Sequence, residues 1–159
     1  MKVDDLPVVL QIADQVHPDF PEDQTVFEER LRLYPAGASV LERDGALCGY
    51  LLSHPWHSGK PPALNSMLGR IPPGADRYYI HDLALLPSGR GTGMAREIIA
   101  RVMADARTQA YPAISLIAVN GSTPFWSRFG FVVDESDQAL AGASSYDTDA
   151  RLMVCTLSG

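Results

Sequence analysis

The feature that most constrains the fold of this chain is an apolar strand that runs into a glycine-rich turn, which then opens a helix. The segment from Leu83 to Ala95 reads Leu-Ala-Leu-Leu-Pro-Ser-Gly-Arg-Gly-Thr-Gly-Met-Ala. The first N–H groups of a helix have no partner within the helix, and the helix dipole is positive at that end. Gly91 and Gly93 carry no Cβ, so the backbone can approach a ligand closely there. The segment therefore predicts an anion site built from main-chain groups.

Two common phosphate-binding motifs do not fit this turn. A Walker loop requires Gly-Lys-Ser/Thr after its glycines, and the turn contains no lysine. A dinucleotide fingerprint requires a third glycine, but that position holds Met94 when counted from Gly89 and Arg96 when counted from Gly91. A plain structural turn is the remaining alternative, although three glycines within five residues are more than a tight turn needs.

The hydrophobic pattern of the rest of the chain predicts a single α/β domain over residues 1–159, a sandwich of helices around a mixed sheet. Residues 113–119 are nearly all apolar, which is typical of a strand covered on both faces. The irregular segment 54–76 contains five prolines, which a central strand does not accept, and 134–150 is expected to be a loop or a pair of strand ends. The expected elements are helices 6–16 and 25–34, strands 38–42, 47–53 and 78–86, helix 93–109, strand 113–119, helix 124–129, and strands 131–133 and 152–157.

Charge and composition narrow the possible partners and location. The net charge is −6, which gives no electrostatic support for binding nucleic acid. No apolar stretch is long enough to span a membrane, and the charged N-terminus does not look like a signal peptide. No Cys/His spacing resembles a zinc site, and the two cysteines, Cys48 and Cys155, lie in apolar runs typical of reduced core residues. We therefore expect a cytoplasmic protein without a metal.

Two blocks of the sequence resemble the GNAT superfamily of N-acetyltransferases. Arg90-x-x-Gly93-x-Ala95 fits the family signature Q/R-x-x-G-x-G/A, and Pro87 stands three residues before it. The segment 120–131, Asn-Gly-Ser-Thr-Pro-Phe-Trp-Ser-Arg-Phe-Gly-Phe, is similar to the family's Asn, short helix and Gly-Phe block. The resemblance implies a mixed, mostly antiparallel sheet flanked by helices and splayed between the fourth and fifth family strands. The family's first strand is expected to be short or missing, because few residues precede the first helix.

The resemblance also implies acetyl-CoA as the cosubstrate and assigns residues to it. Leu83 and Leu85 would offer backbone hydrogen bonds to the pantetheine arm, and Asn120 would steady that arm near the gap in the sheet. The backbone amides of the turn would hold the pyrophosphate; the residues concerned are Arg90, Gly91, Thr92, Gly93, Met94 and Ala95.

Acetyl transfer to an amine requires a proton acceptor, because an aliphatic ammonium has a pKa near ~10 and is not nucleophilic. His81 and Asp82 lie on the strand that the resemblance places beside the thioester. In a regular strand they point to opposite faces, so one of them is expected to enter the cleft, although the family often has a bulge here. Asp82 is the first candidate for the base, directly or through water, and His81 is the second. The alternative is that both have structural roles.

The leaving thiolate can take its proton from an acid, and here the chain departs from the family. The family often has Tyr four residues before its Gly-Phe pair, whereas this chain has Trp126, whose indole cannot transfer a proton at neutral pH. Trp126 either shapes the cleft, stacks on substrate or packs in the core. Other candidates for the acid, which the sequence does not rank, are Ser122, Ser127, Tyr79 and Tyr146.

The acceptor is expected to be a primary amine of a small molecule that attacks the thioester directly in a ternary complex. His54 and Trp56, in the proline-rich segment, are candidates for binding it, together with Tyr79 and Trp126. His17 and Phe20 are candidates for the rim of the same site. Two alternatives stay open: a non-catalytic acyl-CoA-binding sensor of the same fold, and a protein N-terminus or lysine as the acceptor. By resemblance, a homodimer is also possible.

Overall fold

The structure, a computed structural model, describes residues 1–157, with the side chains of residues 137, 138 and 140 left aside. The described part contains five α-helices, six strands and three short 3-10 turns. In chain order these elements are a turn at Val3–Asp5, α1 (Leu6–Val16), α2 (Gln24–Leu33), a turn at Pro35–Gly37, β1 (Ala38–Arg43), β2 (Ala46–Trp56), β3 (Arg77–Leu85), a turn at Pro87–Gly89, α3 (Met94–Thr108), β4 (Ala113–Ala118), α4 (Thr123–Ser127), β5 (Val132–Val133), α5 (Asp137–Ala143) and β6 (Arg151–Thr156).

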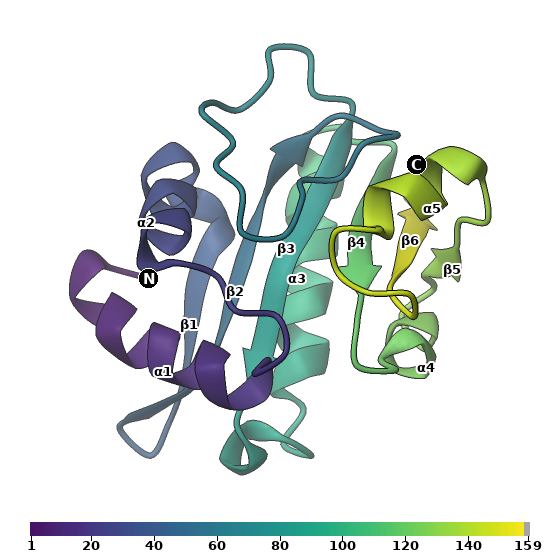
Figure 1. Ribbon diagram of the computed structural model, residues 1–159. Coiled ribbons are helices and arrows are strands. Elements are labelled where there is room, and N and C mark those ends of the chain that lie inside the picture. Colours follow the sequence, from purple (N-terminus) through teal and green to yellow (C-terminus); the bar gives the residue numbers. More distant parts are fainter. Residues whose placement is uncertain (158–159) are drawn as a thin grey trace.

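The strands form one twisted sheet in the order β1-β2-β3-β4-β6-β5. All neighbouring strands are antiparallel except β3 and β4, which run parallel. Helices α1 and α2 cover one face of the sheet and α3 covers the other (Figure 1). The predicted mixed, mostly antiparallel sheet flanked by helices is confirmed.

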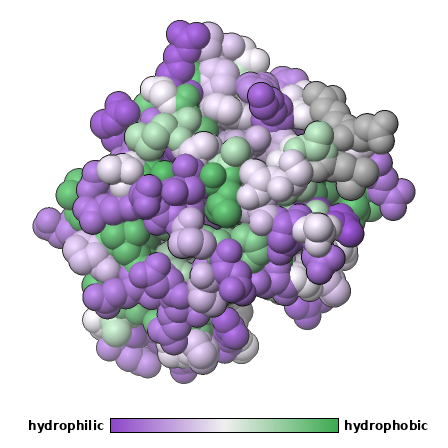
Figure 2. Space-filling model, viewed as in Figure 1, coloured by the Kyte–Doolittle hydropathy of each residue, from purple (hydrophilic) through white to green (hydrophobic). Residues whose placement is uncertain are grey.

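Each face of the sheet has its own core, because each covering helix buries one apolar stripe. On one face, Val9 and Ile12 of α1 pack with Phe27 of α2 over β2. On the other face, Ile99 and Val102 of α3 pack over β3 and β4. The same view as a space-filling model is mostly hydrophilic, with smaller hydrophobic patches between polar side chains (Figure 2). Within residues 1–157, no helix combines the length and the hydrophobicity needed to cross a membrane.

Two details differ from the sequence-based expectations, and neither concerns the family's first strand, which was expected to be short or missing. Strand β2 continues to Trp56 and includes Pro55, which was expected to lie in a loop. Pro55 pairs with Tyr78 on β3 and has no partner on β1, because β1 begins at Ala38, opposite Leu52. Its missing N–H therefore breaks no hydrogen bond to β1. Helix α5 lies within the expected loop 134–150. Within the described residues, no strand precedes α1.

The β3–β4 pair separates after only three residues, and this parting creates the central opening of the molecule. Pairing runs from Tyr78↔Ile114 to Ile80↔Leu116 and then stops. On its other edge, β3 stays paired with β2, but the register shifts between Leu52 and Ser53 so that His81 becomes an extra residue. The sheet is therefore splayed at the predicted place and irregular at the predicted strand.

Candidate active site

The glycine-rich turn leads directly into α3 and presents an open cradle. Gly91 has a φ of 72° and Gly93 a φ of 89°, which side chains with a Cβ rarely adopt. A Cβ built on either residue would point into open space, with no atom within 4 Å. Thr92 braces the turn by donating from its hydroxyl to the carbonyl of Gly89 at 2.7 Å. The turn leaves room for a ligand at the start of a fifteen-residue helix.

A cavity of about 430 Å³ runs from this turn along Leu83 and Leu85 of β3. It meets a second cavity of about 230 Å³ in the parting between β3 and β4. The two share Val16, Leu83, Arg90, Ser122 and Phe125 in their walls. A third hollow of about 420 Å³ lies on the far side of the turn, with Arg96 and Arg128 beside Gly91 and Gly93.

These cavities fit an elongated molecule with a diphosphate in its middle. The diphosphate would sit on the glycine cradle at the positive end of α3. Arg96 and Arg128 would offer positive charge to any further phosphate beside the turn. The narrow, largely apolar channel along Leu83 would take a chain that ends in the parting of the sheet.

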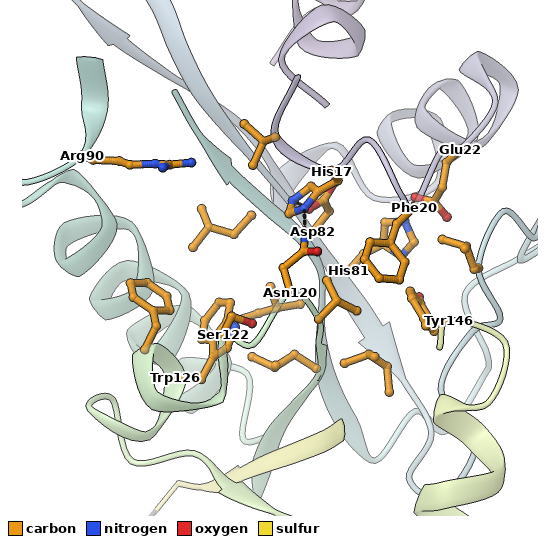
Figure 3. A pocket seen from close by; sticks show the side chains of 18 residues that line it. His17, Phe20, Glu22, His81, Asp82, Arg90, Asn120, Ser122, Trp126 and Tyr146 are labelled. Carbon is orange, nitrogen blue, oxygen red and sulfur yellow. Dashed lines mark hydrogen bonds and ion pairs between the residues drawn. The ribbon is translucent and has the colours of Figure 1, made fainter. Parts of the chain in front are cut away.

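His17 and Asp82 form an ion pair at the middle of the second cavity (Figure 3). The Nε2 atom of His17 lies 3.0 Å from Oδ1 of Asp82, in a close contact that is not well aligned as a hydrogen bond. On its other side, Asp82 accepts a hydrogen bond from the hydroxyl of Tyr50. The Nδ1 atom of His17 lies 3.4 Å from the side-chain amide of Asn120. A polar chain thus crosses the cleft from β2 to the end of β4.

His81 is held by a second carboxylate, that of Glu22, with Nε2 and Oε2 2.7 Å apart. Glu22 also accepts a hydrogen bond from the backbone N–H of Asn65 in the β2–β3 connection. Both His81 and Asp82 belong to the walls of the second cavity. The expectation that only one of them enters the cleft is therefore wrong, because the extra residue in β3 breaks the alternation of side chains.

The two pairs shift the proton affinities of their members. Burial alone would lower the pKa of His17, but the close contact with the charged carboxylate of Asp82 outweighs it and raises that pKa above its usual 6.5. Burial would raise the pKa of Asp82, yet His17, followed by Tyr50, holds it below its usual 3.8. In the same way, His81 outweighs burial and lowers the pKa of Glu22. Both carboxylates are therefore ionised at neutral pH.

The remaining predicted residues are divided between the cleft and the core. Asn120 and Trp126 line the second cavity, although Trp126 is largely buried against Phe131. Ser122 and Tyr146, two candidates for the acid, also line it, whereas Ser127 does not. The ring of Tyr146 lies 6.2 Å from that of Phe20 at the end of the cavity away from the glycine turn.

Three predicted acceptor residues do not line this cavity. The ring of His54 is buried and packs against the rings of Trp56 and Tyr79. Burial lowers the pKa of His54 to about 3. Trp56 donates from its indole N–H to the carbonyl of Lys60. Tyr79 is only 1% exposed. These side chains support the wall behind His81. Among the residues the structure describes, no group of three or more His, Cys, Asp or Glu could hold a metal ion.

Sequence reasoning missed two partners of the predicted residues. Glu22 was not considered, and His17 was expected only on the rim, not bound to Asp82. Both lie in the short connection between α1 and α2, which has no local motif. The break His17-Pro18 ends α1 there, and this was the only sign that the chain turns towards the sheet.

The comparisons with known proteins agree with this geometry. A model described as the acetyltransferase (GNAT) family matches residues 7–131. Among curated proteins, no significant match is found.

Many solved structures share the fold at low identity. Ard1 from Thermoplasma volcanium is 16% identical, with a TM-score of 0.72 over 100% of this chain and 95% of that one. GphF, a GNAT-like decarboxylase in complex with isobutyryl-CoA, is 13% identical, with a TM-score of 0.78 over 99% and 97%. The ribosomal-protein-S18-alanine N-acetyltransferase from Escherichia coli is 14% identical, with a TM-score of 0.67 over 100% and 92%. Because these structures include both a decarboxylase and an N-acetyltransferase, the shared fold does not select one reaction.

Proposed function

The chain belongs to the acetyltransferase (GNAT) family, and on this basis we propose that it transfers an acetyl group from acetyl-CoA to the primary amine of a small molecule. The amine attacks directly, with both substrates bound. When bound, acetyl-CoA supplies a thioester that is already activated towards amines. The protein then has to bind both molecules, orient them and accept a proton.

One observation carries this proposal: the cavity beside the glycine cradle adjoins the cavity of the His17–Asp82 pair, and the two share five wall residues. The first cavity is lined by Gly91, Gly93 and Ala95, and the second by Asp82 and His81. Backbone groups of Arg90 to Ala95 bind the pyrophosphate, and Leu83 and Leu85 bind the pantetheine arm. The reactive end then lies in the parting of β3 and β4, beside the polar chain of Asp82.

The size and lining of the second cavity support a small acceptor. Its volume of about 230 Å³ is below the roughly 300–1,000 Å³ of typical ligand pockets. Apolar side chains such as Phe20, Leu64 and Ile117 form much of its wall. The carboxylates of Glu22 and Asp82 favour an acceptor that arrives as an ammonium ion. A small amine with an apolar body matches these walls.

Residues of β3 take part in removing the proton of the acceptor amine. Asp82 lies in the cavity wall with 16% of its side chain exposed, whereas the side chain of His81 is 1% exposed. The proton therefore leaves through the cluster around Asp82, and His81 with Glu22 supports that cluster from behind.

The test is a panel of small amines incubated with acetyl-CoA and the purified protein. We expect release of free thiol with at least one amine, together with a product heavier by one acetyl group in the mass spectrum. Saturable acetyl-CoA binding without thiol release from any amine would instead favour a non-catalytic sensor. Trp126, which replaces the family's frequent Tyr, is the observation behind that second candidate. Absence of any coenzyme A binding would contradict both.

A further inference from the structure

The cleft contains one side chain that combines exposure to the cavity, a basic atom and a fixed orientation. The side chain of His17 is 18% exposed and lies in the cavity wall. Its Nε2 atom is directed to the carboxylate of Asp82 at 3.0 Å. Its Nδ1 atom lies in a long 3.4 Å contact with the side-chain amide of Asn120, which an incoming ammonium could replace. Figure 3 shows this ring between Arg90 at one end of the site and Tyr146 at the other.

The other two candidates for the base are less suitable. The carboxylate of Asp82 is already bound on both sides, by His17 and by the hydroxyl of Tyr50. His81 is tied to Glu22 at Nε2, and its Nδ1 atom is buried from the cavity without a partner among the described residues. A base must come within hydrogen-bond reach of the proton that it removes. Of the three, His17 alone offers a lone pair to the cleft.

We propose that His17 is the catalytic base and that Asp82 and Tyr50 are positioning residues that orient its ring. This assignment rests on the proposed acetyl transfer and names the atom that serves it. The carboxylate of Asp82, 3.0 Å from Nε2, favours a proton on that nitrogen and so leaves the lone pair on Nδ1. The arrangement follows the logic of carboxylate–histidine pairs in hydrolases, in which the carboxylate fixes the tautomer of the imidazole.

Each turnover moves two protons of the acceptor ammonium to defined places. The acceptor ammonium gives one proton to Nδ1 of His17, which becomes an imidazolium held by Asp82. The freed amine nitrogen forms a bond to the thioester carbonyl carbon, and the bond from that carbon to sulfur breaks. The departing thiolate takes the second proton of the nitrogen, and His17 returns its proton to water. The products are an amide, free coenzyme A thiol and one proton.

The charges around His17 set the pH at which it can act. Asp82 favours the imidazolium, so the pKa of His17 lies above 6.5. The neutral, basic form of the ring appears as the pH rises through this raised pKa. The groups that face the ring or share its cavity are Asp82 and His81 on β3, Tyr50 on β2, Glu22 beside α1, Asn120 after β4, and Arg90 and Tyr146 at the two ends.

The test combines kinetics with an NMR titration of the histidine rings. We compare wild type with His17→Gln, Asp82→Asn and, as a matched control, His57→Gln, whose side chain is exposed outside the cavities. His17→Gln should lower kcat/KM roughly 100- to 10,000-fold and leave acetyl-CoA affinity unchanged, while His57→Gln should change neither. The acceptor's own ammonium, with a pKa near ~10, titrates well apart from His17.

The pH profile separates a base from a merely structural residue. In wild type, kcat/KM should rise with a midpoint that equals the pKa of the His17 ring measured by NMR without substrate. In Asp82→Asn, both values should move to lower pH together, because the charge that favours the imidazolium is gone.

Two results together would overturn the assignment: His17→Gln keeps its activity, and Asp82→Asn loses the pH dependence of kcat/KM. They would return the role of base to Asp82. Absence of thiol release from wild type itself, at any pH, is a different result. It would refute the proposed transfer and the role of His17 with it.

Discussion

At the scale of single residues, two glycines give the turn before α3 its shape. Gly91 and Gly93 combine a positive φ with open space in the direction of a Cβ. The same combination occurs at Gly45, in the exposed turn between β1 and β2, which lines none of the three cavities described above. This gives a natural control, because a substitution at Gly45 suffers the same backbone strain without touching the cradle.

We predict that Gly91→Glu abolishes acetyl-CoA binding, whereas Gly45→Glu leaves it unchanged. Both substitutions should cost roughly 1 kcal/mol of stability through the left-handed backbone. Only Gly91→Glu also puts bulk and negative charge where the pyrophosphate would lie. Isothermal titration calorimetry with acetyl-CoA measures the difference, and equal affinities of the two variants would contradict the phosphate-loop assignment.

The ion pair of His17 and Asp82 should make stability depend on pH in a defined window. The raised pKa of His17 contributes stability that is complete below pH 6.5 and is lost as the pH rises through the folded value. The lowered pKa of Asp82 contributes stability that is complete above pH 3.8 and is lost as the pH falls through its folded value. The pair is therefore strongest between these limits.

We predict that Asp82→Asn lowers the stability by roughly 1–2 kcal/mol near pH ~5 and by less above pH ~8. Melting temperatures across the pH range provide the measurement. Asp44→Asn is the matched control, because the side chain of Asp44 is 90% exposed and its loss should be neutral at every pH. A penalty for Asp82→Asn that does not vary with pH would show that the pair is not ionic.

At the scale of elements, α2 anchors the long connection between β2 and β3 through a buried ion pair. The carboxylate of Glu29 accepts from the guanidinium of Arg30 and from the backbone N–H groups of Leu68 and Gly69. Arg30 donates in turn to the carbonyl of Ser66. The same connection brings Leu64 to the wall of the acceptor cavity. The proline-rich segment is therefore held in place by a helix that precedes it.

We predict that Glu29→Gln destabilises the fold by about 3–5 kcal/mol, because it leaves the buried charge of Arg30 uncompensated. Glu28→Gln, on the exposed side of the same helix, should change the stability by less than about 0.5 kcal/mol. Urea unfolding of both variants provides the comparison. Similar unfolding midpoints for the two would mean that the pair does not anchor the connection.

The sequence predicted elements well where the signal is local and poorly where it depends on distant contacts. The helix over residues 6–16 appears with the predicted bounds, because its apolar spacing alone specifies it. Helix α5 was missed because its sequence is rich in small residues. It depends on contacts such as Gly142 against Pro61, and its one local sign is the cap at Ser136, whose hydroxyl accepts from the N–H of Ala139.

For the candidate site too, local motifs were predicted from the sequence and contacts between distant segments were not. The glycine turn that opens α3 is a local motif, and its place was predicted from the chain between Pro87 and Ala95, while its binding of pyrophosphate stays a prediction. The partners of Asp82 and His81 were not predicted, since His17 and Glu22 reach them only through the docking of α1 and α2 on the sheet. One sequence without its relatives gives no sign of such pairings.

At the scale of the whole molecule, the proposed coenzyme A site implies that this ligand stabilises the fold. We predict that acetyl-CoA at about 100 times its Kd stabilises the fold by about 2.7 kcal/mol. For a chain of this size, that corresponds to a rise in Tm of roughly 5–10 °C, measured by differential scanning fluorimetry. Adenosine triphosphate at the same concentration is the control for non-specific anion binding. An equal rise with both ligands would argue against a site shaped for the pantetheine arm.

The β3–β4 ladder ends early, and this would give the proposed cosubstrate a structural role in the sheet. Only three residue pairs join the half of the sheet that contains β1 to β3 to the half that contains β4 to β6. An extended arm of amides lying in the parting would hydrogen-bond where the ladder stops and add rungs that the polypeptide lacks. The reactant would then also be a building element, and each turnover would assemble and dismantle part of the sheet.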